Sequence, residues 1–136
     1  MKRKFSAVVV FVFCLGFYVQ AQQNPLKITL VPVAGPVYAL QGSGGNIGLV
    51  ADAAGMFMVD AMFERAADAI REAVKTLPGG DRVRVLLNTH WHSDHTDGNK
   101  ALGPGAVIIA HENVRALLAN DQTLMRGQTK ALPSNA

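Results

Sequence analysis

The chain has 136 residues, and its 13 Lys and Arg against 10 Asp and Glu give a formal net charge of +3. This length is enough for one domain of ordinary size and no more. The single cysteine, Cys14, lies in the apolar opening segment, so the rest of the chain has no disulfide and no thiolate to act as nucleophile or metal ligand.

Residues 1–21 have the order of a secretory signal peptide. Met1-Lys2-Arg3-Lys4 is basic, residues 7–19 are almost wholly apolar, and Val19-Gln20-Ala21 offers small residues for cleavage. A membrane anchor is the alternative, but the apolar run is shorter than the roughly 18 residues that a span needs. Cleavage removes three basic residues and leaves equal numbers of acidic and basic ones, which argues against a nucleic-acid partner. We expect a periplasmic or secreted domain over residues 22–136, with no membrane attachment.

Short strands are predicted in the first part of this domain. They cover residues 27–31, 37–41, 46–51 and 56–60. Pro32 ends the first strand, glycines follow the second, and Asp52-Ala53-Ala54-Gly55 reads as a four-residue hairpin loop.

The apolar period then changes to that of a helix over residues 62–77, which ends at Pro78-Gly79-Gly80. A buried strand is expected at 82–88, a short helix near 98–102, a strand at 106–110 and a helix at 112–119. The tail after residue 120 shows no clear period. Strands followed by alternating helices and strands indicate a layered α/β fold.

Three of the four histidines, His90, His92 and His95, follow the strand at 82–88 directly. In α/β folds, ligands gather at the carboxyl ends of strands. Extended chain places His90 and His92 on the same side, and a turn into a helix would bring Asp94 and His95 beside them. Imidazole and carboxylate suit zinc, at about 2.0–2.2 Å. The pattern therefore predicts a metal site rather than a polar loop with ordinary histidines.

The residues around this cluster have plainer interpretations. Thr96 or Asp97 is expected to cap the short helix that follows, and Gly98 to permit close backbone packing. Trp91 is expected to pack against its surroundings rather than to take part in catalysis. For His111 we favour a local hydrogen bond at a strand–helix junction over a role as a metal ligand.

The segment His90-x-His92-x-Asp94-His95 resembles the HxHxDH motif of the metallo-β-lactamase superfamily. Further similarity lies in Gly44-Gly45-Asn46, in Met58-Val59-Asp60 at a strand end, and in residues 110–115. The resemblance covers residues 28–118. It implies the α/β fold of that family, a metallo-β-lactamase-like αββα sandwich, of which this chain would be the amino-terminal half only.

The resemblance also implies roles for individual residues. His90 and His92 would bind a first zinc ion, and Asp94 and His95 a second. Asp60 would orient a ligand by a hydrogen bond. In the family, a hydroxide shared by the two metals attacks a carbonyl carbon, and Asp94 would be catalytic by positioning that hydroxide. The best-known β-lactamase subclass of the family has arginine at the position of His95. In having histidine there, the chain resembles the other dizinc subclass and the glyoxalase-II-like hydrolases.

The chain departs from the family pattern after His111, because no later residue is His or Cys, whereas the family takes three more ligands from its second half. We therefore expect an incomplete amino-terminal fragment without competent catalysis of its own. Its parent would be a secreted zinc hydrolase acting on a small-molecule β-lactam, lactone or thioester. The alternative is a non-catalytic half-domain that serves as a binding or assembly module, since one half alone leaves an apolar sheet face uncovered. Substrate and oligomeric state stay open.

Overall fold

A computed structural model describes residues 26–42, 44–80, 82–120, 122–124 and 127–129. The predicted signal peptide at 1–21 lies outside the described residues. Within the described ranges, no helix combines the length and the apolar character that crossing a membrane would require.

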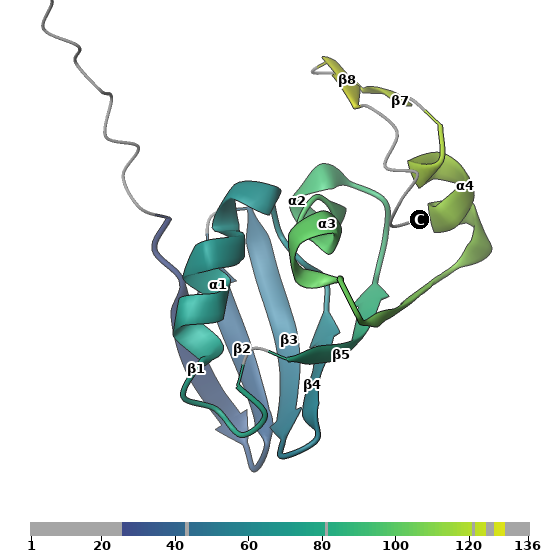
Figure 1. Cartoon of the computed structure of the whole chain (residues 1–136). Helices are drawn as coiled ribbons and strands as arrows, with labels where there is room; N and C mark the ends of the chain where they lie inside the picture. The colour runs from purple at the N-terminus through teal and green to yellow at the C-terminus, as the bar shows by residue number, and fades with distance from the viewer. Residues whose placement is uncertain (1–25, 43, 81, 121, 125–126, 130–136) are drawn as a thin grey trace, which may run out of the picture.

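One mixed sheet of six strands organises the fold, in the order β1-β2-β3-β4-β5-β6 (Figure 1). The strands are β1 Thr29–Ala34, β2 Val37–Gly42, β3 Gly45–Asp52, β4 Gly55–Val59, β5 Val83–Asn88 and β6 Val107–Ala110. β1 to β4 pair antiparallel, whereas β4, β5 and β6 pair parallel. Parallel neighbours need a crossover connection, and both crossovers here are helical. The predicted α/β arrangement is confirmed.

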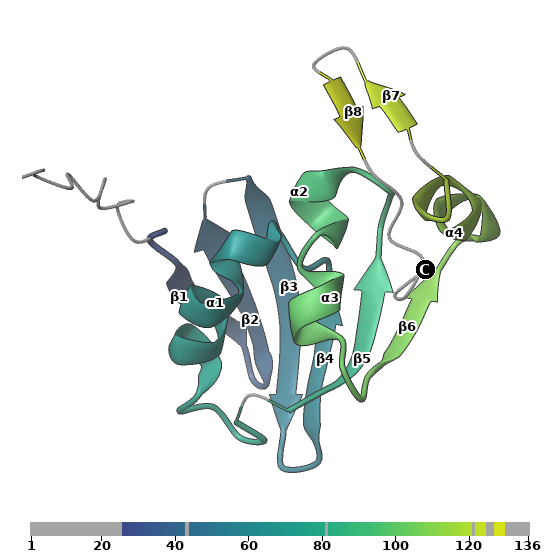
Figure 2. The same cartoon turned by 45° about the horizontal axis from the view of Figure 1, so that its top comes forward.

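The helices of the crossovers lie on one face of the sheet (Figures 1 and 2). The helical elements are the 3-10 turn η1 Glu64–Ala66 and the helices α1 Ala67–Val74, α2 Ser93–Thr96, α3 Asn99–Leu102 and α4 Glu112–Leu118. The helix predicted at 62–77 is therefore shorter than expected. Met62 has a left-handed φ of 55°, which a helix does not admit, so helical backbone begins only at η1.

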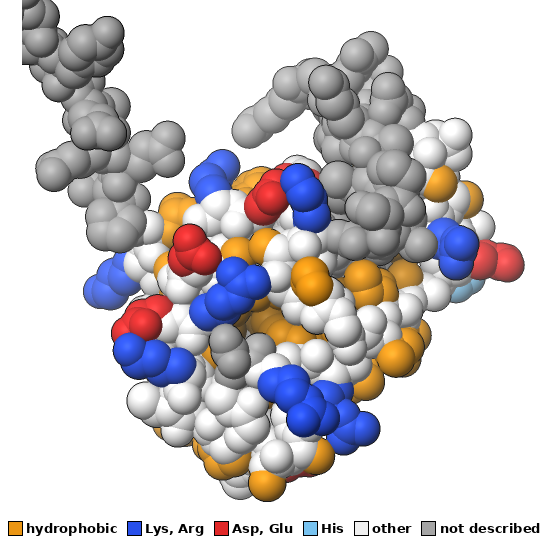
Figure 3. Space-filling model, in the orientation of Figure 1, with side chains coloured by type: hydrophobic (Ala, Val, Ile, Leu, Met, Phe, Trp, Pro, Cys, Tyr) orange, Lys and Arg blue, Asp and Glu red, His pale blue; other side chains and the backbone are white. Residues whose placement is uncertain are grey.

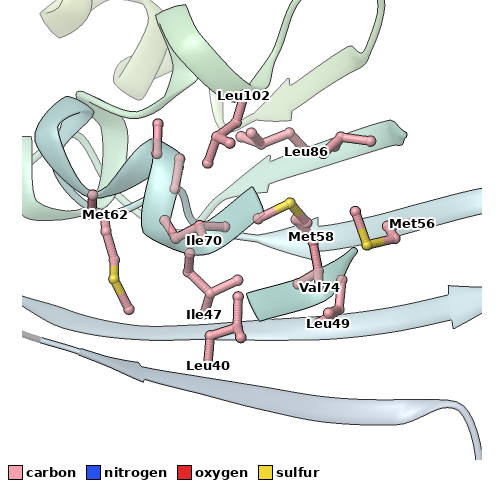
Figure 4. Packing of buried hydrophobic residues seen from close by; sticks show 14 of the residues in the cluster. Leu40, Ile47, Leu49, Met56, Met58, Met62, Ile70, Val74, Leu86 and Leu102 are labelled. Carbon is pink, nitrogen blue, oxygen red and sulfur yellow. The ribbon is translucent and has the colours of Figure 1, made fainter. Parts of the chain in front are cut away.

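Alternate residues of the strands build the core against these helices (Figure 4). The buried cluster takes Leu40, Ile47, Leu49, Met56, Met58 and Leu86 from the sheet, and Ile70, Val74 and Leu102 from α1 and α3. The helix face at three- and four-residue steps is thus confirmed as the buried face of α1.

The intervening strand residues line the other, open face of the sheet. One row runs in register across five strands, because Val37 pairs with Val50, Val50 with Phe57, Phe57 with Val85, and Val85 with Val107. A second row links Val59, Leu87 and Ile109. Val107, Ile109, Val50, Val37 and Phe57 are all exposed, as the interpretation of an uncovered apolar face anticipates.

Two local predictions were wrong. β1 continues through Pro32 to Ala34, which is possible because β1 is an edge strand and a proline without an N–H is tolerated there. The hairpin loop is tighter than four residues, because Asp52 pairs with Gly55 and its Oδ1 accepts from the Ala54 N–H at 2.7 Å. The tail, for which no element was predicted, holds the paired strands β7 Gln122–Leu124 and β8 Gly127–Thr129.

Candidate metal centre

The histidine motif occupies the crossover that leaves the carboxyl end of β5. The chain bends after Asn88, and α2 begins at Ser93. Backbone hydrogen bonds fasten this crossover to the chain just after β4. The Ala61 N–H donates to the His95 carbonyl at 2.8 Å, and the Gly98 N–H donates to the Met62 carbonyl at 2.9 Å. The motif is therefore held between the end of β5, which it follows, and the chain just after β4.

Gly98 makes this close approach possible. A Cβ atom at Gly98 would lie 2.0 Å from the Ala61 carbonyl oxygen, which confirms the expected close packing. Behind it, the buried amides of Asn88 and Asn99 exchange two hydrogen bonds, of 3.1 and 2.7 Å. Asn88 also reaches the His95 carbonyl at 3.4 Å. These amides satisfy each other inside the crossover and stiffen it.

The expectation that Thr96 or Asp97 caps the short helix was wrong. Thr96 is the last residue of α2, and its hydroxyl donates to the carbonyls of His92 at 3.0 Å and Trp91 at 3.3 Å. No side chain caps the start of α3. A buried threonine inside a short helix bonds back to the preceding turn instead of capping the next one.

Three imidazole rings of the motif lie side by side. The ring centroids of His90 and His92 are 4.8 Å apart, and those of His90 and His95 are 4.0 Å apart. Asp94 Oδ2 lies 3.4 Å from His95 Nε2. The indole of Trp91 packs edge-on against His92, with centroids 4.8 Å apart. The structure thus brings together all four residues that the sequence predicts as metal ligands.

A buried carboxylate supports this cluster from below. Asp60 is only 5% exposed and follows β4 with a left-handed φ of 66°, a conformation that aspartate adopts more readily than most residues. Its Oδ1 accepts from the Thr89 N–H at 2.8 Å, and its Oδ2 lies 2.8 Å from His95 Nδ1. Because a carboxylate only accepts, the bond between His95 and Asp60 requires a proton on His95 Nδ1.

Thr89 is part of the same network, although no sequence pattern singled it out. Its hydroxyl donates to Asp60, with Oγ1 2.8 Å from Oδ2 and 3.1 Å from Oδ1. The same oxygen lies 3.0 Å from His90 Nδ1. A threonine directly after a strand has no distinctive pattern; only its position before the first histidine of the motif would have drawn attention to it.

The surroundings of His90 favour its neutral form. Desolvation lowers the pKa of His90, and the nearby His95 and His92 lower it further. A neutral imidazole is the form that binds metal. Within the described residues, however, no three of the His, Cys, Asp and Glu side chains already form a group that could hold a metal ion. The donors fit zinc by type and by adjacency, and their assignment as ligands stays a prediction.

Comparison with known proteins accounts for this arrangement. The profile of the metallo-β-lactamase superfamily matches residues 40–106, which include the end of β2, all of β3 to β5 and the whole histidine motif. The chain belongs to this superfamily. Its α/β fold is the corresponding part of the metallo-β-lactamase fold.

A curated hydroxyacylglutathione hydrolase of Erythrobacter litoralis is 38% identical over 52 residues, which cover 37% of this chain and 21% of that protein. A subclass B3 metallo-β-lactamase of Bradyrhizobium japonicum is 20% identical with a TM-score of 0.63, over 76% of this chain and 42% of that one. A β-lactamase from Chitinophaga pinensis is 25% identical with a TM-score of 0.66, over 79% and 43%. The chain thus spans less than half of the length of each of these hydrolases.

The remaining histidine of this metallo-β-lactamase segment has a structural role. His111 is the N-cap of α4, and its Nδ1 accepts from the Asn113 N–H at 3.1 Å. The predicted local hydrogen bond at the strand–helix junction is confirmed. His111 therefore offers a matched control for substitutions within the histidine motif.

A hollow of about 700 Å³ lies at the opposite end of β5 from the motif. Its lining comes from α1, from the start of β5 and from the α3–β6 connection, and includes Arg71, Arg82, Arg84 and Leu102. Figure 3 shows basic side chains on either side of a hollow with an apolar floor. Among the residues that line it there is no histidine. The candidate metal centre and this hollow are separate features.

Proposed function

We propose that this chain supplies the first metal-binding segment of a zinc-dependent hydrolase that works outside the cytoplasm. The observation that carries the proposal is the hydrogen bond from His95 Nδ1 to the buried Asp60, beside the rings of His90 and His92. Histidine ligands of metals commonly donate their other ring N–H to a carboxylate in this way.

His90 and His92 would hold one zinc ion, and Asp94 and His95 the other. With Nδ1 committed to Asp60, His95 has only Nε2 to offer, and Asp94 Oδ2 lies on that side of the ring. Bound zinc supplies a Lewis acid that polarises a carbonyl group and makes water acidic near neutral pH. Asp94 would accept a hydrogen bond from the attacking water and so orient it, which is the catalytic role proposed for this residue.

The proposed substrate is a small molecule with a hydrolysable carbonyl, of the β-lactam, lactone or thioester type. Support comes from the relatives, a hydroxyacylglutathione hydrolase and several β-lactamases. Export rests on the signal peptide proposed for residues 1–21. If the protein is exported and its signal peptide is cleaved, amino-terminal sequencing of the periplasmic or secreted product will begin at Gln22, whereas an exported product that retains Met1 would contradict cleavage.

Calorimetric titration with zinc tests the metal-binding proposal. The 136-residue chain is compared with His92→Ala and with the matched control His111→Ala. We expect His92→Ala to weaken zinc binding by about tenfold or more, since even residues that only orient ligands change affinity by about 10–100-fold. His111→Ala should bind as the parent does, because its ring caps α4. Equal affinities in all three proteins would refute the assignment, as would equal losses in both variants.

The open face of the sheet favours a second candidate, an assembly module without catalysis of its own. Its rows of valine, leucine, isoleucine and phenylalanine are in register across the sheet, and large exposed apolar patches usually mark interaction sites. Sedimentation measures this directly. A dimer that Phe57→Lys converts to monomer supports the assembly module, and a monomeric parent rules out assembly with a second copy of the chain.

A further inference from the structure

We propose that Thr89 is a positioning residue. Its hydroxyl bonds both to Asp60 and to the ring of His90, and so fixes how that ring is oriented. One buried carboxylate would then fix the rings of both predicted metal positions: His95 directly and His90 through Thr89. The significance for metal binding rests on the proposed function. The hydrogen-bond arrangement itself is a property of the metal-free chain.

The argument follows from counting protons. The Thr89 hydroxyl has one proton, and Asp60 Oδ2 lies 2.8 Å from its oxygen. A carboxylate offers acceptors only, so the hydroxyl must donate to Asp60. If the proton turned towards His90 instead, two acceptor oxygens would face each other at hydrogen-bond distance with no hydrogen between them.

The consequence for His90 is a defined tautomer. Thr89 Oγ1 lies 3.0 Å from His90 Nδ1, and with its proton already donated, this oxygen can only accept. His90 Nδ1 therefore carries the proton, and Nε2 carries the lone pair. His95 has the same tautomer through its own bond to Asp60. The centroids of the two rings lie 4.0 Å apart. With Nδ1 protonated in each, both rings would offer Nε2 to a metal ion.

The backbone of Thr89 makes the hydroxyl testable by itself. The Thr89 N–H donates to Asp60 Oδ1 at 2.8 Å, and any side chain at this position retains that bond. Thr89 is exposed, so valine, which has the same shape without a hydroxyl, leaves no buried polar group behind. Thr89→Val removes the hydroxyl's bonds to Asp60 and to His90, while Asp60 keeps its bonds to the Thr89 N–H and to His95 Nδ1. Thr89→Ser restores the hydroxyl.

Nitrogen-15 NMR of the imidazole rings tests the proposal on the 136-residue chain without metal, at mildly alkaline pH. In the parent, we expect the proton on Nδ1 in both His90 and His95. In Thr89→Val, His90 should lose this preference while His95 keeps it, and Thr89→Ser should match the parent. A parent His90 with its proton on Nε2 overturns the proposal, even if Thr89→Val fails to fold. An unchanged His90 tautomer in a folded Thr89→Val also overturns it.

Zinc titration of the same variants provides a second readout. Thr89→Val should bind zinc about tenfold more weakly, with recovery in Thr89→Ser. Zinc affinity that is equal in Thr89→Val and the parent would show that His90 does not depend on the hydroxyl. If the parent binds no zinc at all, the proposed function fails, whereas the tautomers still decide the role of Thr89. The two proposals therefore fail separately.

Discussion

The two faces of the six-stranded sheet carry similar side chains in different surroundings. On the face covered by α1, α2 and α3, Leu86 and Met58 are 0% exposed, whereas on the other face Val107 is 64% and Ile109 is 46% exposed. Because successive strand residues point to opposite faces, adjacent residues such as Phe57 and Met58 fall on either side of this divide. The apolar character of a strand therefore does not tell which face is covered.

The crossover connections decide which face is covered. One runs from β4 through α1 to β5, and the other from β5 through α2 and α3 to β6. Parallel strands are joined by right-handed crossovers, so both connections come to the same side. The histidine motif is part of the second crossover, fastened to the chain after β4 by the bonds of Ala61 and Gly98. The covered face therefore serves both the stability of the fold and the placement of the candidate metal centre.

The largest expected difference between the faces is in how far truncation of a side chain lowers the free energy of unfolding. Leu86→Ala should lower the free energy of unfolding by about 2–5 kcal/mol, because it leaves a cavity in a closely packed core. Ile109→Ala, on the open face, should cost less than about 1 kcal/mol, since much of that side chain already contacts water. Urea denaturation of the two variants and the parent measures both values. A loss at Ile109 as large as that at Leu86 would show that something covers the open face in solution.

Glycine offers a second comparison between the faces. Gly98→Ala should lower the free energy of unfolding by about 3 kcal/mol, towards the upper end for an overpacked site. The reason is that the new Cβ would lie 2.0 Å from the carbonyl oxygen of Ala61. On the open face, a Cβ at Gly48 would lie 3.4 Å from the Val59 side chain, an ordinary contact. Gly48→Ala should therefore be neutral or add about 0.5–1 kcal/mol, since glycine weakens a strand interior.

Thermal and urea unfolding of these two variants check the expectation. If Gly98→Ala were as stable as the parent, the histidine crossover would have to lie further from the end of β4 than the structure places it. A marked loss in Gly48→Ala would instead mean that the open face has no room for a methyl group, and hence that it is occupied.

Much of the fold could be predicted from periodicity, because strands and α1 each bury one face. The boundaries that were wrong depend on tertiary position. Pro32 is acceptable only because β1 lies at the edge of the sheet, and the helix begins late only because Met62 takes a left-handed conformation. A local pattern contains neither fact. The order of strands and the covered face likewise follow from the crossovers rather than from any single segment.

The candidate site divides in the same way. The order and spacing of His90, His92, Asp94 and His95 stand out in the sequence, because few structural needs explain three imidazoles so close together. The supporting contacts join residues far apart in the chain, such as Asp60 with His95 and Thr89. Of these, a resemblance suggested Asp60 alone. Hydrogen bonds of this kind depend on where two strands end relative to each other, which composition and spacing do not reveal.

The smallest expected effect concerns Asp97, on the turn between α2 and α3 on the covered face. Burial raises the pKa of Asp97, and the nearby carboxylate of Glu64 raises it further. Folding thus favours the protonated carboxyl of Asp97 over the ionised one. The stability that the protonated carboxyl contributes is fully present below the unfolded pKa and is lost as pH rises through the higher folded pKa. At neutral pH, Asp97→Asn should therefore raise the free energy of unfolding, by about 0.5 kcal/mol or less because solvent screens the site. Urea denaturation at several pH values should show this gain shrinking as pH falls through the folded pKa.

Asp68→Asn is the control and should give no gain, since the Asp68 side chain is fully exposed and pairs with Arg71. A gain that grew towards low pH would reverse the assigned sign.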